Sequence, residues 1–399
     1  MKGIIFLFIL FCFFPYIDMA RMGTDTQPNA IIMASVILFM FKNKRINAPI
    51  IILWVLFILS LLLIYKSNVT FFIYVKTCLN YLSPALISFA AYTIFTRLNY
   101  KVSYSFFMTS VLIYMCVGLI QLYLIPDFFT FLVNGQARGI LEGGRGVVSL
   151  APEPAFYGSM CLFLIVFSLI SYTRKQNLIA VPILFFQMLF ISRSATALVI
   201  LLLSLLIFGC VQLLKLRVRY LAIGFITVLL LIPVYNSFLN NIEGTRIASI
   251  YESFIDDPLL ITKVDQSVGI RFTGAVAPFL ALKENNFLPM GLGYYKPFLR
   301  ELYISGKYRS FLTKVIVNEK IRLGGSANMI LFQFGFIGFL FLIAIYLFFK
   351  PQIKKSDAGL YAMILFTCIL FTQIQLMHSM IGLIMAAALI PKNKAIAVQ

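Results

Sequence analysis

The chain has 399 residues, of which 61% are hydrophobic and only 12% are charged, and its mean hydropathy is +0.96. These values exclude an ordinary soluble domain and indicate an integral membrane protein. The net charge of +19 does not indicate nucleic-acid binding, because most of the surplus is spread over short loops between apolar segments.

Apolar segments follow one another along most of the chain, and a hydrocarbon core about 30 Å thick needs roughly 20 such residues as a helix. We expect about twelve spans, with roughly eleven to thirteen as the range. They are 3–17, 29–41, 48–65, 69–95, 103–125, 153–173, 177–191, 195–214, 219–235, 327–349, 357–376 and 378–390. The first follows Lys2 like a signal peptide, but it lacks a small-residue cleavage site, so we interpret it as an anchor. The sequence thus predicts an all-α polytopic membrane protein in which residues 1–399 form a single transmembrane domain.

The charges divide between alternate loops. One set of short loops holds 16 basic residues and a single acid, Asp357, whereas the other 13 of the 14 acids fall in the opposite set. Because basic residues favour the cytoplasmic loops of membrane proteins, both termini are predicted to be cytoplasmic. Two polar stretches, 126–152 and 236–326, are then a smaller and a larger external loop.

The composition also excludes several chemistries. All six cysteines lie within apolar spans, and the only histidine, His378, lies between the last two, so neither a disulfide framework nor a zinc site is expected. No Walker A motif is present, which excludes ATP-driven transport by this chain alone. We therefore predict no metal and no cofactor. We interpret four polar residues within or between spans as hydrogen-bonding partners between helices, namely Gln121, Gln373, Gln375 and His378.

The smaller external loop carries the densest group of candidate site residues. Arg138 and Arg145 stand among four glycines, which allow a backbone to approach a ligand closely. Glu153 and Pro154 then open the sixth span, and Tyr157 follows one turn later. Glu153 either caps this helix or, as an acid at the mouth of a span, accepts a proton from a sugar hydroxyl.

A second candidate segment, Ser192–Thr196, is the short outer connection between the seventh and eighth spans, and it holds Arg193 at the interface. The alternative is a turn with a snorkelling arginine, but such arginines favour the inner side, so we favour a functional role. In the long loop, residues 269–283 have apolar side chains at helical spacing. They predict an amphipathic helix along the interface, with Arg271 near its start.

Further along the long loop, Gly291, Gly293 and Tyr294 precede a basic run that includes Arg300. These residues could contact an anionic substrate or simply form a solvated face. Asn328, at the entrance of the tenth span, either hydrogen-bonds substrate or caps the helix, and we favour the cap.

Together these segments resemble the O-antigen and capsule polymerase family, which is related to the O-antigen ligases. The resembling features are an Arg/Gly-rich outer loop ending in Glu153-Pro154, the Ser192-Arg193-Ser194 turn, a long outer loop with Arg271 and then Gly291-x-Gly293, and an Asn328-led span with Gly335 and Gly338. The stretch from Gly146 to Gly158 is the best local match. Elsewhere the resemblance rests on the arrangement of short motifs across nearly the whole chain.

The resemblance implies a GT-C-like glycosyltransferase of the bacterial inner membrane that works at the periplasmic face. Such an enzyme moves a growing glycan from one undecaprenyl diphosphate onto the non-reducing end of another carrier-linked repeat unit, with neither a nucleotide sugar nor a metal. Its expected partners are the undecaprenyl-diphosphate-linked oligosaccharide, membrane lipid and a chain-length regulator, and no nucleic acid.

The resemblance also assigns roles to residues. External arginines are held to be essential in this family, and the residues that match them by position are Arg145, Arg193 and Arg271. Glu153 is the candidate base. The remaining candidates are expected to bind substrate, and they are Arg138, Tyr157, Gly291, Gly293, Tyr294, Arg300 and Asn328.

Two alternatives remain at this point. The related ligases carry a functional histidine in the long outer loop, and no histidine occurs in 236–326, which favours a polymerase. A flippase for lipid-linked oligosaccharides, a transporter, would also have about twelve spans. We expect such a carrier to have two similar halves with charged residues lining a central cavity, and to lack so long an outer loop.

Overall fold

The computed structural model describes residues 1–18, 26–41, 46–63, 71–133, 146–214, 266–308, 324–372 and 374–390. Within these ranges the chain is helical and contains no strand, apart from one isolated bridge between Ile17 and Val133. The helices are α1 (Lys2–Phe13), α2 (Asn29–Met40), α3 (Ala48–Leu62), α4 (Phe71–Arg97), α5 (Tyr104–Tyr123), η2 (Thr130–Leu132), α7 (Pro154–Ser171), α8 (Arg174–Phe186), the π-helical η3 (Gln187–Ile191), α9 (Ala195–Leu214), α13 (Gln266–Glu284), α14 (Tyr295–Ser305), α16 (Ser326–Phe334), η4 (Gly335–Gly338), α17 (Phe339–Ile353), α18 (Asp357–Leu370) and α19 (Ser379–Ala388).

Five helical stretches in the described ranges are long and apolar enough to cross a membrane. They are Thr77–Arg97, Tyr104–Tyr123, Pro154–Ser171, Ala195–Leu214 and Ser326–Ile353. Shorter apolar helices accompany them, namely α1, α2, α3, α18 and α19. The chain is thus a helical protein with the character of a membrane protein, as its composition predicts. Every other expected span overlaps a helix or consecutive helices, whereas 219–235 and Gln373 lie outside the described residues.

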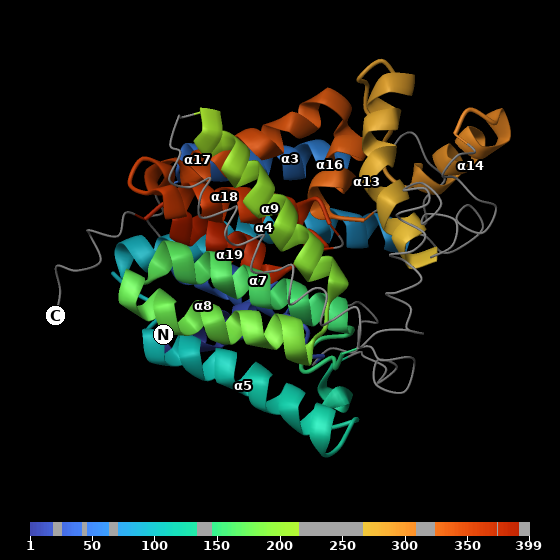
Figure 1. Ribbon diagram of the computed structural model, residues 1–399. Helices are drawn as coiled ribbons and strands as arrows, with labels where there is room; N and C mark the ends of the chain where they lie inside the picture. The colour runs from blue at the N-terminus through green and yellow to red at the C-terminus, as the bar shows by residue number, and fades with distance from the viewer. Residues whose placement is uncertain are drawn as a thin grey trace.

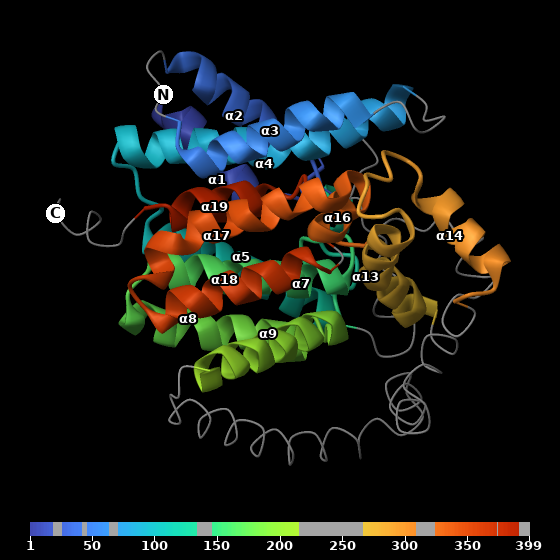
Figure 2. The same cartoon turned by 90° about the horizontal axis from the view of Figure 1, so that it is seen from above.

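The spans pack as a bundle whose helices run in roughly one direction, across the page in Figures 1 and 2. The start of α1 and the end of α19 lie at the same end of this bundle, which we call the terminal end. Hydrogen bonds join helix ends there: the Gln352 side chain donates to the carbonyl of Ala388, and the Tyr172 hydroxyl donates to the carbonyl of Val102. The opposite end, which carries α13 and α14, we call the loop end.

Among the described residues, charged side chains at the terminal end are mostly basic, whereas those at the loop end are of both signs. At the terminal end, exposed basic residues flank the ends of α4 and α17 and the starts of α1 and α8. They are Lys2, Arg97, Lys101, Arg174, Lys175, Lys350, Lys354 and Lys355. At the loop end, the described acids include Asp127, Glu153 and Glu284.

Buried polar side chains hold the loop end together. Nε2 of His378 lies 3.0 Å from the hydroxyl of Tyr16, and its ring stacks on Phe163 with 4.7 Å between centroids. Oγ1 of Thr26 donates to Oε1 of Gln375 over 3.3 Å. Both contacts join segments far apart in the sequence, so the interpretation of His378 and Gln375 as structural partners is confirmed.

The expected tenth span, 327–349, is not one continuous helix. The structure divides it into α16, η4 and α17, and Gly335 at the junction has φ +60°. The physical reason is a close approach of backbones, since a Cβ on Gly335 would lie 2.4 Å from the carbonyl oxygen of Phe287. The Phe336 amide donates to that same oxygen over 2.9 Å. The turn after α13 therefore docks into the break, and this docking positions the external helices.

Candidate functional site

Two of the predicted motifs meet at the loop end. The amide of Val147 donates to the carbonyl of Ile191 over 3.1 Å, and a Cβ on Gly146 would lie 2.1 Å from the carbonyl oxygen of Ser192. One turn into α7, a Cβ on Gly158 would lie 2.6 Å from the Cβ of Ser194. Only glycine permits these approaches at both positions. The Gly146–Gly158 stretch and the Ser192–Thr196 turn thus form one packed unit.

A buried hydrogen-bond network fixes the backbone that leads into Glu153. The amide of Ser149 donates to Oε1 of Gln121 over 2.6 Å, and Nε2 of Gln121 donates back to the carbonyl of Ser149 over 3.1 Å. The Ser149 hydroxyl donates to the carbonyl of Tyr114 over 2.7 Å. Because all these groups are buried and paired, the loop before α7 is rigidly held, and Gln121 has the structural role expected of it.

Tyr157 belongs to this network rather than to a surface. Its hydroxyl donates to Oε1 of Gln187 over 2.8 Å and lies 3.2 Å from the carbonyl of Tyr114. The side chain is fully buried between α5, α7 and η3. The expected contact of Tyr157 with substrate therefore finds no support, because its hydroxyl is already hydrogen-bonded to Gln187 inside the bundle.

Glu153 occupies the N-cap position of α7, but its side chain makes no capping hydrogen bond. Its backbone carbonyl accepts from the amides of Phe156 and Tyr157 at 3.0 and 3.1 Å, so the backbone alone starts the helix. The side chain is exposed at the loop end. The carboxylate therefore does not cap the helix, and it is accessible for chemistry.

Arg193 projects from a tightly held turn. Ser192 and Ser194 on either side of it are buried, and the Ser192 hydroxyl donates to the carbonyl of Met188 over 2.9 Å. Arg193 itself is exposed and has φ +45°, a left-handed conformation that non-glycine residues adopt at a cost. The fold thus maintains a strained position that presents a guanidinium at the same end as Glu153.

The helix predicted over 269–283 is present as α13, and Figure 1 shows it running across the loop end rather than along the bundle. Arg271 lies in its first half, is half-buried and already interacts with a neighbouring group. The helix packs on the start of α16 through small residues, since a Cβ on Gly274 would lie 3.1 Å from the amide nitrogen of Gly324.

Gly291 and Gly293 reverse the chain between α13 and α14. Both have positive φ, +83° and +75°. The amides of Met290 and Gly291 donate to the carbonyls of Phe332 and Gln333, at 3.3 and 3.1 Å, at the end of α16. Because the Gly291 amide is used in this way, the two glycines act here as a turn that docks onto the broken helix.

Helix α14 presents cations on its outer face. Phe298, Leu299 and Leu302 are buried on its inner face, whereas Lys296 and Arg300, one turn apart, are exposed. Tyr294, just before the helix, donates its hydroxyl to Oε1 of Glu301 over 2.6 Å. This hydrogen bond to the Glu301 carboxylate raises the pKa of Tyr294. Tyr294 therefore serves α14 in this conformation, and Arg300 remains available to an anion.

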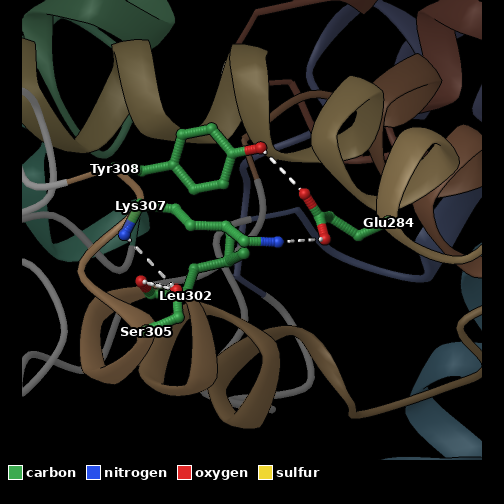
Figure 3. Close-up of polar contacts among 5 residues, drawn as sticks. All are labelled: Glu284, Leu302, Ser305, Lys307 and Tyr308. Atoms are coloured by element: carbon green, nitrogen blue, oxygen red, sulfur yellow. Dashed lines mark hydrogen bonds and ion pairs between the residues drawn. The ribbon is translucent and has the colours of Figure 1, made fainter.

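An acid links the ends of the two external helices (Figure 3). At the end of α13, Oε2 of Glu284 lies 3.2 Å from Nζ of Lys307, and its Oε1 accepts from the hydroxyl of Tyr308 over 2.9 Å. The hydrogen bond from Tyr308 and then that from Lys307 lower the pKa of Glu284. The contact joins α13 to the segment after α14, and it lies at the surface, where ion pairs contribute little.

The favoured interpretation of Asn328 as a helix cap is wrong. The cap of α16 is Gly325, and Asn328 lies three residues further on, with its amide nitrogen donating to the carbonyl of Phe371 over 2.8 Å. The helix starts earlier than its apolar pattern suggests because Gly325, at φ +82°, turns the chain against the backbone of Thr372. Asn328 is thereby carried into a buried position.

Of the predicted site residues, Glu153 and Arg193 lie on one packed unit, and Arg271 and Arg300 lie on the external helices at the same end. Arg138 and Arg145 lie outside the described residues. Two buried hydroxyls at this end, on Thr273 and Tyr295, cannot be recognised as site candidates from the sequence, because a single Thr or Tyr in an apolar stretch does not indicate function. Within the described ranges, no three His, Cys, Asp or Glu side chains gather in a group that could hold a metal ion.

Comparison of the chain with protein-family models, with curated proteins and with solved structures gives no match.

Proposed function

We propose that this chain is a membrane glycosyltransferase that polymerises lipid-linked oligosaccharides, an O-antigen or exopolysaccharide polymerase. The substrate would be an oligosaccharide on undecaprenyl diphosphate, in the inner membrane of a bacterium. Both termini would lie in the cytoplasm, and the loop end would face the periplasm. A chain-length regulator is a candidate partner.

One observation carries the proposal: the Gly146–Gly158 stretch and the Ser192–Thr196 turn pack directly on each other. The first is the best local match of the resemblance, and the second carries the Arg193 turn that the resemblance also includes. Their contact leaves Glu153 and Arg193 exposed at one end of an apolar bundle. An acid and a guanidinium at such a boundary suit a substrate with a lipid anchor and a polar head.

The chemistry requires stabilisation of the departing diphosphate. The acceptor hydroxyl oxygen would bond to the anomeric carbon of the donor glycan as the bond from that carbon to the phosphate oxygen breaks. Negative charge then develops on the lipid diphosphate, and arginines would meet it with paired N–H donors. Arg193 is our first candidate for this role, and Arg145 and Arg271 are further candidates.

The proton of the acceptor hydroxyl needs a destination. The carboxylate of Glu153 would accept it as general base and release it to water afterwards. Because Glu153 makes no capping bond, this role would cost α7 no interaction. On the outer face of α14, Lys296 and Arg300 would hold a phosphate or an anionic part of the glycan.

The test is reconstitution of the purified chain in lipid nanodiscs with a synthetic repeat unit on undecaprenyl diphosphate. We expect a ladder of products that still carry lipid diphosphate, formed with a chelator present. Transfer only to a lipid A core acceptor would instead indicate a ligase. In sealed vesicles, movement of the substrate across the bilayer without a ladder would indicate a flippase and would refute the proposal.

A further inference from the structure

Three buried side-chain oxygens around the start of α16 have no hydrogen-bond partner among the described residues. They are Oγ1 of Thr273, the hydroxyl of Tyr295 and Oδ1 of Asn328. The side chains are 0%, 8% and 1% exposed, respectively. Buried polar groups in proteins are almost always paired, so three such atoms on three helices that pack together require an explanation.

Contacts at Gly274 and Phe332 bring the three residues to one place. A Cβ on Gly274 would lie 3.1 Å from the Gly324 amide nitrogen and 3.9 Å from the Tyr295 hydroxyl, and Thr273 is the preceding residue of α13. The Tyr295 ring packs edge-on against Phe332, with 5.4 Å between centroids.

Asn328 joins this group because it precedes Phe332 by one turn on the same face of α16. Helices α13, α14 and α16 thus each hold one unpaired oxygen, on a residue at or within one turn of these contacts.

The chemistry of this group favours a neutral ligand rich in hydroxyls. Two of the three groups both donate and accept, and the third is an acceptor. Nearby backbone carbonyls of Phe371 and Ile374 accept bonds from Asn328 and Ser326 at 2.8 and 2.7 Å, so the start of α16 is rich in acceptors. An anion is disfavoured there. Burial raises the pKa of Tyr295, which keeps its hydroxyl protonated.

We propose that Thr273, Tyr295 and Asn328 form a subsite for a sugar ring, with their free oxygens hydrogen-bonding its hydroxyl groups. The proposal rests on the proposed function for the identity of the glycan. Under it, α13 and α14 serve two ends of one substrate: the exposed cations meet its charged part, and the buried oxygens meet a sugar ring. A polymerase needs such recognition because its donor and acceptor share the same lipid carrier.

Binding of a soluble glycan to the resting protein tests the subsite. The probe is an oligosaccharide of one repeat unit, released by mild acid from the surface polysaccharide of the strain that makes this chain. Its dissociation constant for the purified full-length protein is measured by titration calorimetry. The variants are Thr273→Val and Tyr295→Phe, which remove one unpaired hydroxyl each. Tyr303→Phe on the same helix is the matched control.

We expect each of the two variants to weaken binding about threefold to tenfold, as the loss of one neutral hydrogen bond does, and the control to leave it unchanged. The midpoint of thermal unfolding of Tyr295→Phe should be unchanged or higher, because the hydroxyl it removes has no partner to lose.

The subsite is refuted by wild-type affinity in both variants, by lack of binding to the wild type, or by a lower unfolding midpoint of Tyr295→Phe with unchanged affinity. Since no lipid donor is used, a chain that binds the glycan but forms no ladder would refute the proposed function and leave the subsite intact.

Discussion

Replacing Arg193 by glycine separates the role of its guanidinium from the stability of its turn. Arg193 has φ +45°, which costs a non-glycine residue roughly 1–2 kcal/mol, and glycine adopts this conformation freely. Against this gain, glycine has about 0.5–1 kcal/mol more conformational entropy to lose on folding. The two effects nearly cancel, so Arg193→Gly should change the free energy of unfolding by no more than about 1 kcal/mol.

The effect on the reaction should be far larger. If the guanidinium stabilises the departing diphosphate, its loss resembles the removal of one oxyanion donor, which lowers the rate by roughly 10²–10³-fold. Arg193→Lys keeps the charge but lacks the planar fork, so it should retain an intermediate rate. Initial rates of ladder formation in nanodiscs measure the effect, and thermal unfolding in detergent checks the fold.

The control is Arg97→Ala, which removes an exposed arginine from the opposite end of the bundle and should leave the rate unchanged. A ladder formed by Arg193→Gly within about twofold of the wild-type rate, with an unchanged unfolding midpoint, would show that this guanidinium takes no part in the reaction. The assignment of its turn to the site would then be wrong.

Three further predictions concern the supports of the site. Gly335→Ala should destabilise the chain by about 2–4 kcal/mol in thermal unfolding, because its Cβ would lie 2.4 Å from a backbone oxygen at φ +60°, whereas Gly209→Ala, with open space around it, should be neutral or slightly stabilising. Gly146→Ala places a Cβ 2.1 Å from a backbone oxygen of the turn that holds Arg193, so it should lower the ladder rate at least as much as Arg193→Lys, and a normal rate would argue against the coupling of the two segments. The lowered pKa of Glu284 means that its stabilisation is complete above its ordinary pKa of 4.5 and disappears as pH falls through the lower folded value, so the difference in unfolding midpoint between wild type and Glu284→Gln should be present at pH 7 and vanish in strong acid.

The positions of the apolar helices were predictable because each lies in a long apolar run, although some ends differ, as at Leu370 of α18. Segment 195–214 coincides with α9, and the expected span 357–376 begins where α18 does, after Ser356, whose hydroxyl accepts from the Gly359 amide over 3.1 Å. In contrast, the break at Gly335 was not predicted, because hydropathy averages over a window and the cause is a contact with a turn that is distant in sequence. A glycine within an apolar run is compatible with either outcome.

Some site residues could likewise be predicted from the sequence, whereas others depend on tertiary contacts. Arg193 could be proposed from the sequence because a charge beside an apolar span must lie at its end, and Arg300 because it stands in a basic run of a polar loop. Whether Tyr157 and Asn328 are available to a substrate depends on tertiary contacts. Tyr157 donates to the side chain of Gln187, and Asn328 donates to the backbone carbonyl of Phe371. Sequence gives the type of a polar group but not whether a neighbour already occupies it.

The loop end is built on two supports that are held in different ways. Glu153 and Arg193 extend from the bundle itself, where buried bonds such as that between Ser149 and Gln121 allow little movement. Arg271 and Arg300 are carried by α13 and α14, which attach to the bundle at α16, through the turn that docks at Gly335 and through apolar packing against Phe332.

A reaction between two lipid-linked chains, one of which grows at every cycle, needs a fixed centre where bonds change. It also needs a more adaptable surface that accepts and releases the glycan. Under the proposed function the rigid support would provide the first and the external helices the second. Substitutions at Arg193 should then reduce turnover, whereas substitutions on α14 should mainly raise the substrate concentration needed for half-maximal rate.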